Sequence, residues 1–133
     1  MLVSFYGGNK MEKLKGRWVI ETHKGTLLGY KMKKKLYSGK SRFQKIEVYA
    51  TENNGNILLL DNCFMLTERE EFVYHEMITH VPLFSHLRPE KVLIIGGGDC
   101  GTSREVLKHR CVKLLDFVEI DKKVVEIAKK YFK

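Results

Sequence analysis

Long hydrophobic runs, paired cysteines and prolines are what this 133-residue sequence has least of. No apolar run approaches the roughly 20 residues that a membrane-spanning helix needs, and the apolar start is too short for a signal peptide. We therefore expect a cytoplasmic protein with no membrane partner. The three cysteines, Cys63, Cys100 and Cys111, form no CxxC pair and have no histidine at zinc-ligand spacing, which predicts reduced thiols and no metal site.

The composition, with 44% apolar residues, 30% charged residues and only 2 prolines, is that of an ordinary folded protein. The net charge of +8 comes from the N-terminal end: residues 1–40 hold 10 Lys/Arg and 2 Asp/Glu, whereas residues 41–133 hold 14 of each. A basic stretch such as residues 31–35 can follow phosphates. No nucleic-acid signature accompanies it, so we interpret it as a solvated face and expect no nucleic-acid partner.

Short segments rich in β-branched and aromatic residues fill the first half of the chain and predict antiparallel strands. Asn53-Asn54-Gly55 separates the last two and predicts a tight hairpin, because these residues accept positive φ. The segment Trp18–Glu21 is the first with a clear pattern, and Met11 is a candidate for the true start. The predicted strands are Leu27–Tyr30, Lys35–Tyr37, Phe43–Tyr49 and Asn56–Leu60.

A helix is predicted from about Glu68 to His80. Thr67 and Glu70 have the spacing of a capping box, and Pro82 is expected to end the helix. Residues at three- and four-residue steps should share one face. These are Phe72, His75, Glu76, Thr79 and His80.

The remaining sequence predicts a β-α-β-α unit. Residues 91–95 form a continuous apolar run typical of a buried parallel strand, and residues 102–109, 113–120 and 122–132 follow as helix, strand and helix. The predicted fold class is α/β (α+β overall). A small antiparallel β domain, 1–66, precedes a linking helix and a truncated Rossmann-like, methyltransferase-type unit, 67–133.

Gly96, Gly98 and Gly101 satisfy G-x-G-x-x-G between the predicted strand and helix, and Glu119 and Asp121 end the next strand. Glycines allow close approach of a ligand to the backbone, and an acid about 20 residues on can accept hydrogen bonds from ribose. This pattern alone leaves nicotinamide dinucleotides and S-adenosyl-type nucleosides both open.

Asp99 separates these alternatives. A carboxylate inside the turn would repel the pyrophosphate of a dinucleotide where a helix N-terminus should attract it, whereas a sulfonium or amine would be favoured. Acids can point away from a ligand, so the argument favours a cationic nucleoside without excluding a dinucleotide.

Several linked motifs, in one order from about Ser41 to Phe132, resemble the spermidine synthase (polyamine aminopropyltransferase) family. The motifs are Gly96-Gly97-Gly98-Asp99-x-Gly101-x-x-Arg104-Glu105, Val118-Glu119-Ile120-Asp121, Leu66-Thr67-Glu68-Arg69-x-Glu71-Phe72-x-Tyr74-His75-Glu76-Met77-Ile78 and His80-Val81-Pro82-Leu83-Phe84. The resemblance implies aminopropyl transfer from decarboxylated S-adenosylmethionine to a polyamine acceptor, usually putrescine, giving spermidine and methylthioadenosine. It implies no metal or redox cofactor, and a dimer or tetramer.

By the same resemblance, the nucleoside would be bound by Gln44, Gly96, Gly98 and Glu119, and the aminopropyl and polyamine groups by Tyr74, His75 and Asp99. Plainer roles stay open: Gln44 as a solvent-facing residue, Tyr74 and His75 as ordinary helix residues, and Glu119 as a helix cap, although Asp121 fits that role better. Asp99 has the weakest structural alternative.

The sequence departs from the family at Cys100, where a further glycine is usual, and at Met65, where many members have glutamine. A side chain at position 100 would be strained if the turn needs positive φ there. The family's catalytic loop, Asp-x-x-Asp, would follow Lys133, so this chain holds no catalytic residue and little transferase activity is expected of it alone. The alternatives are an inactive nucleoside-binding or oligomerising remnant, an S-adenosylmethionine methyltransferase and an NAD-dependent oxidoreductase.

Overall fold

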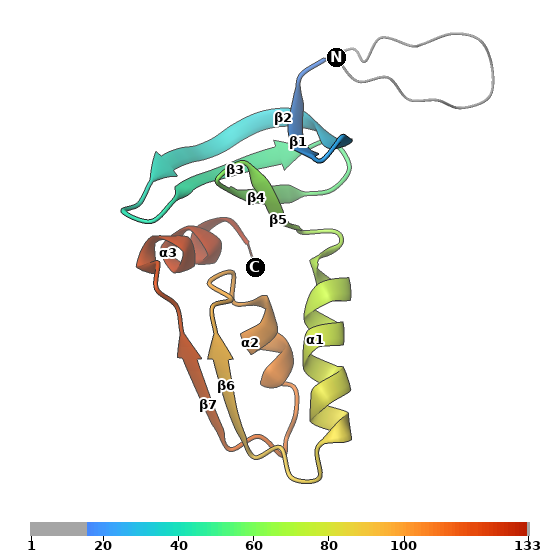
Figure 1. The fold of residues 1–133 in the computed structure, drawn as a ribbon, viewed down its shortest axis with the longest axis vertical. Helices are drawn as coiled ribbons and strands as arrows, with labels where there is room; N and C mark the ends of the chain where they lie inside the picture. The colour runs from blue at the N-terminus through green and yellow to red at the C-terminus, as the bar shows by residue number, and fades with distance from the viewer. Residues whose placement is uncertain (1–15, 133) are drawn as a thin grey trace, which may run out of the picture.

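The computed structural model describes residues 16–132, so the candidate start at Met11 lies outside the described residues. An antiparallel sheet at the top of Figure 1 is joined through α1 to a smaller α/β unit below it. The elements are β1 (Trp18–His23), β2 (Thr26–Lys40), β3 (Lys45–Thr51), β4 (Asn56–Leu60), β5 (Cys63–Thr67), α1 (Glu71–Ser85), β6 (Lys91–Ile95), α2 (Gly101–Val106), β7 (Leu114–Val118) and α3 (Lys122–Tyr131).

The N-terminal sheet has the strand order β1-β2-β3-β4-β5, with every neighbouring pair antiparallel. The hairpin predicted at Asn53-Asn54-Gly55 is confirmed, because it joins β3 to β4. Gly55 has φ +68°, and the Thr51 amide donates to the Gly55 carbonyl at 2.9 Å. The hairpin was predictable because its geometry is a property of three consecutive residues.

Two features of this sheet differ from the prediction. The segments expected as two strands, Leu27–Tyr30 and Lys35–Tyr37, form one strand, β2, whose pairing register shifts twice between Met32 and Tyr37. Such bulges bend a strand without ending it. Strand β5 was missed, although Asp61 and Asn62, both at positive φ, form the tight turn that precedes it.

The basic stretch at residues 31–35 lies on β2, and Lys33, Lys34 and Lys35 are exposed, as a solvated face requires. Part of its charge is paired within the sheet. Lys35 Nζ lies 2.9 Å from the carboxylate of buried Glu47, and Lys31 Nζ lies 3.1 Å from that of Glu52. The stretch is therefore partly neutralised by Glu47 on β3 and by Glu52 in the turn that follows β3.

Helix α1 begins and ends later than predicted. The Glu70 amide does donate to Thr67 Oγ1, at 3.2 Å, but this contact closes a turn and the helix begins at Glu71. Pro82 lies inside the helix and does not end it. Proline removes one backbone donor, and the last turn is still held by the His86 amide bonding to the Pro82 carbonyl and by Ser85 Oγ bonding to the Val81 carbonyl.

The β-α-β-α unit is confirmed, with β6 and β7 pairing in parallel from Lys91–Leu114 to Ile95–Val118. Alternate side chains point to opposite faces of this small sheet. The burial predicted for residues 91–95 is wrong, because no residue of β6 is buried. One face of this sheet is exposed within the described residues: Leu93, Ile95 and Val118 are 60%, 81% and 57% exposed. Among residues 16–132, no helix is long and apolar enough to cross a membrane.

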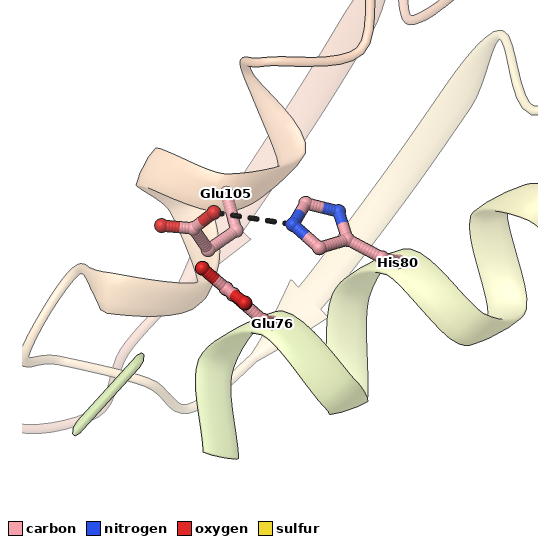
Figure 2. Close-up of side chains that lie close together, drawn as sticks. All are labelled: Glu76, His80 and Glu105. Atoms are coloured by element: carbon pink, nitrogen blue, oxygen red, sulfur yellow. Dashed lines mark ion pairs between the residues drawn. The ribbon is translucent and has the colours of Figure 1, made fainter. Parts of the chain in front are cut away.

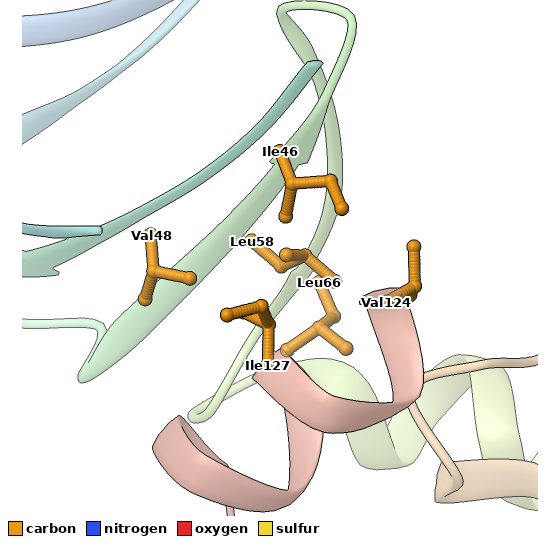
Figure 3. Packing of buried hydrophobic residues seen from close by; sticks show 6 residues of the cluster. All are labelled: Ile46, Val48, Leu58, Leu66, Val124 and Ile127. Atoms are coloured by element: carbon orange, nitrogen blue, oxygen red, sulfur yellow. The ribbon is translucent and has the colours of Figure 1, made fainter. Parts of the chain in front are cut away.

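One buried cluster joins the two parts of the chain. The sheet contributes four side chains and α3, which lies against the sheet, contributes two (Figures 1 and 3). They are Ile46, Val48, Leu58, Leu66, Val124 and Ile127. Apolar residues three apart on α3 share one face, so the helix packs on the sheet by its amphipathic pattern.

Truncating this cluster should unfold the protein at lower denaturant. Leu58 is 1% exposed, so Leu58→Ala should cost about 2–5 kcal/mol in the free energy of unfolding, through lost burial and the cavity left behind. Leu87→Ala is the matched control, because Leu87 is 98% exposed and its truncation should change stability by less than about 0.5 kcal/mol. Equal denaturant midpoints for the two variants would contradict this account of the core.

Candidate functional site

The glycine turn connects β6 to α2. Gly96 and Gly97 have φ of +85° and +72°, a backbone region that residues other than glycine rarely adopt. The Gly96 amide donates to the Val118 carbonyl at 2.8 Å, which fixes the turn beside the end of β7. A Cβ on Gly98 would lie 2.8 Å from Glu119 Oε2, so the glycine allows the acid to approach. The structure thus brings Gly98 and Glu119 together.

Glu119 and Asp121 follow β7 and have different roles. Asp121 is buried and caps α3, with Oδ1 accepting from the Lys123 amide at 3.0 Å. Glu119 is half-buried, and its Oε1 accepts from the Asp121 amide at 3.0 Å. The capping role proposed for Asp121 is therefore observed, and Glu119 does not cap the helix.

Gln44 reaches this region from the loop between β2 and β3. Its Nε2 donates to Asp121 Oδ2 at 3.0 Å, and Ser41 Oγ donates to the same oxygen at 2.7 Å. Burial raises the pKa of Asp121, but these bonds outweigh it and hold the pKa below its usual value. The Gln44 side chain therefore does not face solvent. Its hydrogen bond to Asp121 connects the N-terminal sheet to the segment that follows β7.

Asp99 lies in a chain of charged groups that runs from the turn to α1 and α2. Its Oδ1 accepts from the Gly101 amide at 2.7 Å and lies 3.1 Å from His75 Nε2. His75 Nδ1 contacts Glu71 on the other side. Both Glu71 oxygens lie 2.8 Å from Arg104 Nη2. Asp99 thus has the structural partners that the sequence did not predict.

The charges in this chain reinforce one another. Burial lowers the pKa of His75, but the hydrogen bonds to Asp99 and Glu71 outweigh burial and raise it above the usual value. Burial raises the pKa of Asp99, but His75 and the Gly101 amide outweigh it, and the pKa is lowered. The pKa of Glu71 is also lowered, because Arg104 and His75 outweigh its burial. The raised pKa of His75 and the lowered pKa values of Asp99 and Glu71 all shift the equilibrium toward the charged forms.

A cavity of about 290 Å³ opens beside this chain of charges. Of the predicted site residues, His75 and Asp99 line it; Tyr74, Gln44, Gly96, Gly98 and Glu119 do not. Tyr74 is 63% exposed and touches the site only through its edge-on contact with the His75 ring. The lining residues are Leu66, Glu68, Glu71, His75, Asp99, Cys100, Gly101, Arg104, Ala128, Lys129 and Phe132.

Cys100 also lines this cavity and has φ +68°, so the strain expected of a side chain at this position is present. Burial, followed by the charge of Asp99, raises the pKa of its thiol. Cys100 therefore offers a neutral, protonated side chain to the cavity at neutral pH.

Glu71 and Arg104 were not predicted as site residues. They lie 33 positions apart in the sequence, and they meet only because α1 and α2 pack side by side. Both residues stand inside the motifs that carry the family resemblance. That position is the one signal that could have found them.

A second cluster joins α1 to α2 further along both helices. Figure 2 shows Glu76 and His80 of α1 pointing toward Glu105 of α2, and ligand atoms of these three residues lie within 4.8 Å of one another. Glu105 is buried and already has cationic partners, with Lys108 Nζ at 2.5 Å and Arg104 Nε at 2.9 Å. His80 Nε2 lies 3.3 Å from Glu105, so this carboxylate contacts α1 while Arg104 and Lys108 balance its charge.

The approach of His75 to Gly101 leaves no room for a side chain. A Cβ on Gly101 would overlap the His75 ring, so Gly101→Ala should cost about 1–3 kcal/mol in the free energy of unfolding. Adding His75→Ala should recover part of that cost, because the obstructing ring is removed. Gly29→Ala is the control, since its Cβ would make only ordinary contacts. Strictly additive costs in the double variant would contradict the proposed clash.

The buried imidazolium predicts a pH dependence of stability. The pKa of His75 is raised above 6.5 on folding, so its stabilising effect is complete below pH 6.5 and is lost as pH rises through the folded pKa. The melting temperature should therefore fall from pH 6.5 to 9 in the natural protein and stay flatter in His75→Gln. Exposed His23→Gln should keep the natural profile. Parallel profiles for the natural protein and His75→Gln would refute this role for His75.

Two family models match almost the whole described chain. The Spermidine synthase tetramerisation domain matches residues 17–68, and the Spermine/spermidine synthase domain matches residues 71–133. The polyamine aminopropyltransferase of Thioalkalivibrio sulfidiphilus is 51% identical over 90% of this chain and 42% of its own length. That of Methanocaldococcus jannaschii is 53% identical over 86% and 39%. The chain thus spans about two fifths of these relatives.

Solved structures agree with the sequence comparisons. A spermidine synthase in complex with the transition state analogue AdoDATO superposes with a TM-score of 0.86 at 43% identity, covering 96% of this chain and 44% of that one. Spermidine synthase from Thermotoga maritima has the same TM-score and identity, covering 96% and 45%. With its glycine turn, its acidic cluster and both family models in one order, the chain belongs to the spermidine synthase (polyamine aminopropyltransferase) family.

Proposed function

We propose that this chain provides the donor-nucleoside site and part of the amine site of an aminopropyltransferase. The reaction would transfer an aminopropyl group from decarboxylated S-adenosylmethionine to putrescine, giving spermidine and methylthioadenosine. The observation that carries the proposal is Asp99, an ionised carboxylate on the wall of a cavity, one residue after the glycine that contacts Glu119. Family membership supports the same reaction.

The chemistry is a displacement at carbon and needs no metal or redox cofactor. A neutral amine attacks the carbon next to the sulfonium, forming a C–N bond as the C–S bond breaks, and the amine then loses a proton. The catalytic contribution of the protein is to hold donor and acceptor in line and to stabilise the charges involved. We expect no residue of this chain to be the general base.

Most predicted site residues keep their proposed role under this reaction, whereas the roles of Gln44 and Tyr74 change. Glu119 would accept hydrogen bonds from the ribose hydroxyls, beside the backbone that Gly96 and Gly98 leave open. Asp99 and His75 would hold an ammonium group in the cavity, and exposed Tyr74 would border its entrance. Gln44 would act through Asp121, because its amide nitrogen already donates there.

A dinucleotide would fit this turn less well than a cationic nucleoside. The pyrophosphate of NAD would meet the Asp99 carboxylate, and the only helix that begins at the turn, α2, spans just Gly101–Val106. The hydrogen bond from the Gly101 amide to Asp99 already uses a donor of that helix end. The same turn is compatible with a sulfonium or an amine, which a carboxylate attracts.

We further propose that the protein assembles through its N-terminal sheet. The match of residues 17–68 to a tetramerisation domain supports this proposal. Strand β1 lies at one end of the strand order, and an edge strand is a common place for pairing with another chain. A dimer or tetramer is therefore the expected state.

Calorimetry with methylthioadenosine tests the nucleoside site. Binding should weaken about tenfold or more in Glu119→Gln, since a bond to an ionised acceptor contributes about 1.5–3 kcal/mol. Glu126→Gln, an exposed acid on α3, should bind as the natural protein does. NADH should give no heat. Unchanged binding in Glu119→Gln, or tight binding of NADH, would count against the proposed function.

A further inference from the structure

His75 faces a carboxylate oxygen at each of its two ring nitrogens: Glu71 at Nδ1 and Asp99 at Nε2. A neutral imidazole has one N–H and one lone pair. It would therefore turn a lone pair toward one of two ionised carboxylates, whereas an imidazolium donates to both. His75 is 2% exposed, so water cannot relieve that repulsion. The geometry by itself favours the charged ring.

The formal charges of this group cancel. Asp99 and Glu71 each contribute one negative charge, and His75 and Arg104 each contribute one positive charge. The other ionisable groups that line the same cavity are Glu68 before α1, Cys100 in the turn and Lys129 on α3. An ammonium group entering beside Asp99 would therefore meet a carboxylate whose charge is already compensated by a buried imidazolium.

We propose that an amine binds beside Asp99 by exchange, releasing the proton of His75 Nε2 to solvent as the ammonium replaces the imidazolium. The ammonium then donates to Asp99 and to the freed Nε2 lone pair. His75 keeps its Nδ1–H on Glu71, which Arg104 holds. Glu71 and Arg104 are thus positioning residues that select the tautomer of His75.

The balance of the step is simple. One proton leaves His75 and one ammonium charge enters, so the group stays neutral overall. No bond to carbon changes, and no oxidant or reductant is involved. A nearby like charge disfavours the charged imidazole, which supplies the driving force for release. This inference rests on the proposed amine site. It adds that the net charge of this group of residues does not change when the amine binds.

The exchange predicts proton release that calorimetry can count. Putrescine is titrated into the protein, saturated with methylthioadenosine, at pH 6.5 in phosphate and in Bis-Tris, whose ionisation enthalpies differ. The difference in heat should correspond to release of up to one proton per amine. Putrescine affinity should rise by up to about tenfold per pH unit between pH 6 and 7.

Three variants assign the proton. Glu71→Gln should reduce the release to near zero while putrescine still binds, because one of the two carboxylates that hold the imidazolium is removed. His75→Gln should bind with no release and no pH slope. Glu76→Gln, the adjacent but exposed acid outside the cavity, should release as the natural protein does.

The outcomes separate the two claims. Putrescine binding with no proton release, or release that persists in His75→Gln, would overturn the exchange and leave the amine site standing. No putrescine binding, in the presence of normal methylthioadenosine binding, would overturn both the amine site and the exchange. Release that depends on His75 and Glu71 would support both.

Discussion

The contact between the His75 ring and the backbone of Gly101 is the constraint on which the site depends. It brings α1 against the start of α2 so closely that position 101 has no space for a Cβ. From that position His75 reaches Asp99 in the turn, and Glu71, one helical turn earlier, reaches Arg104 on α2. A buried charged ring in turn requires these partners, because an unpaired buried charge is costly. Packing and electrostatics therefore specify each other here.

A second set of contacts, between α3 and the N-terminal sheet, positions the other side of the site. Val124 and Ile127 anchor α3 in the core of the N-terminal sheet, and Ser41 and Gln44 bond the Asp121 cap at the start of the same helix. Because Asp121 follows Glu119 by two residues and its amide bonds the Glu119 carboxylate, the position of that acid depends on the N-terminal sheet. The sheet thus positions the acid that follows β7.

What could be predicted from the sequence was local. The Asn53-Asn54-Gly55 hairpin, the apolar strand before the glycines and the Asp121 cap each follow from a few consecutive residues, and the structure has all three. The bend of β2, the continuation of α1 through Pro82 and the Glu71–Arg104 pair depend on neighbours distant in the sequence. The structural role of Asp99 was missed for the same reason, since its partner His75 lies 24 residues earlier on another element.

Asp99 therefore has two roles: it determines which ligand charge the site favours, and it stabilises the fold around His75. Its charge disfavours an anionic ligand, as the turn suggested, but that charge already stabilises His75 and the start of α2. A carboxylate with a buried counter-ion does not attract an amine as a free one would. Under the proposed exchange, the counter-ion changes its protonation state when a cation binds, and a histidine ring can do so near neutral pH. Arginine at position 75 would keep its charge and compete with the amine.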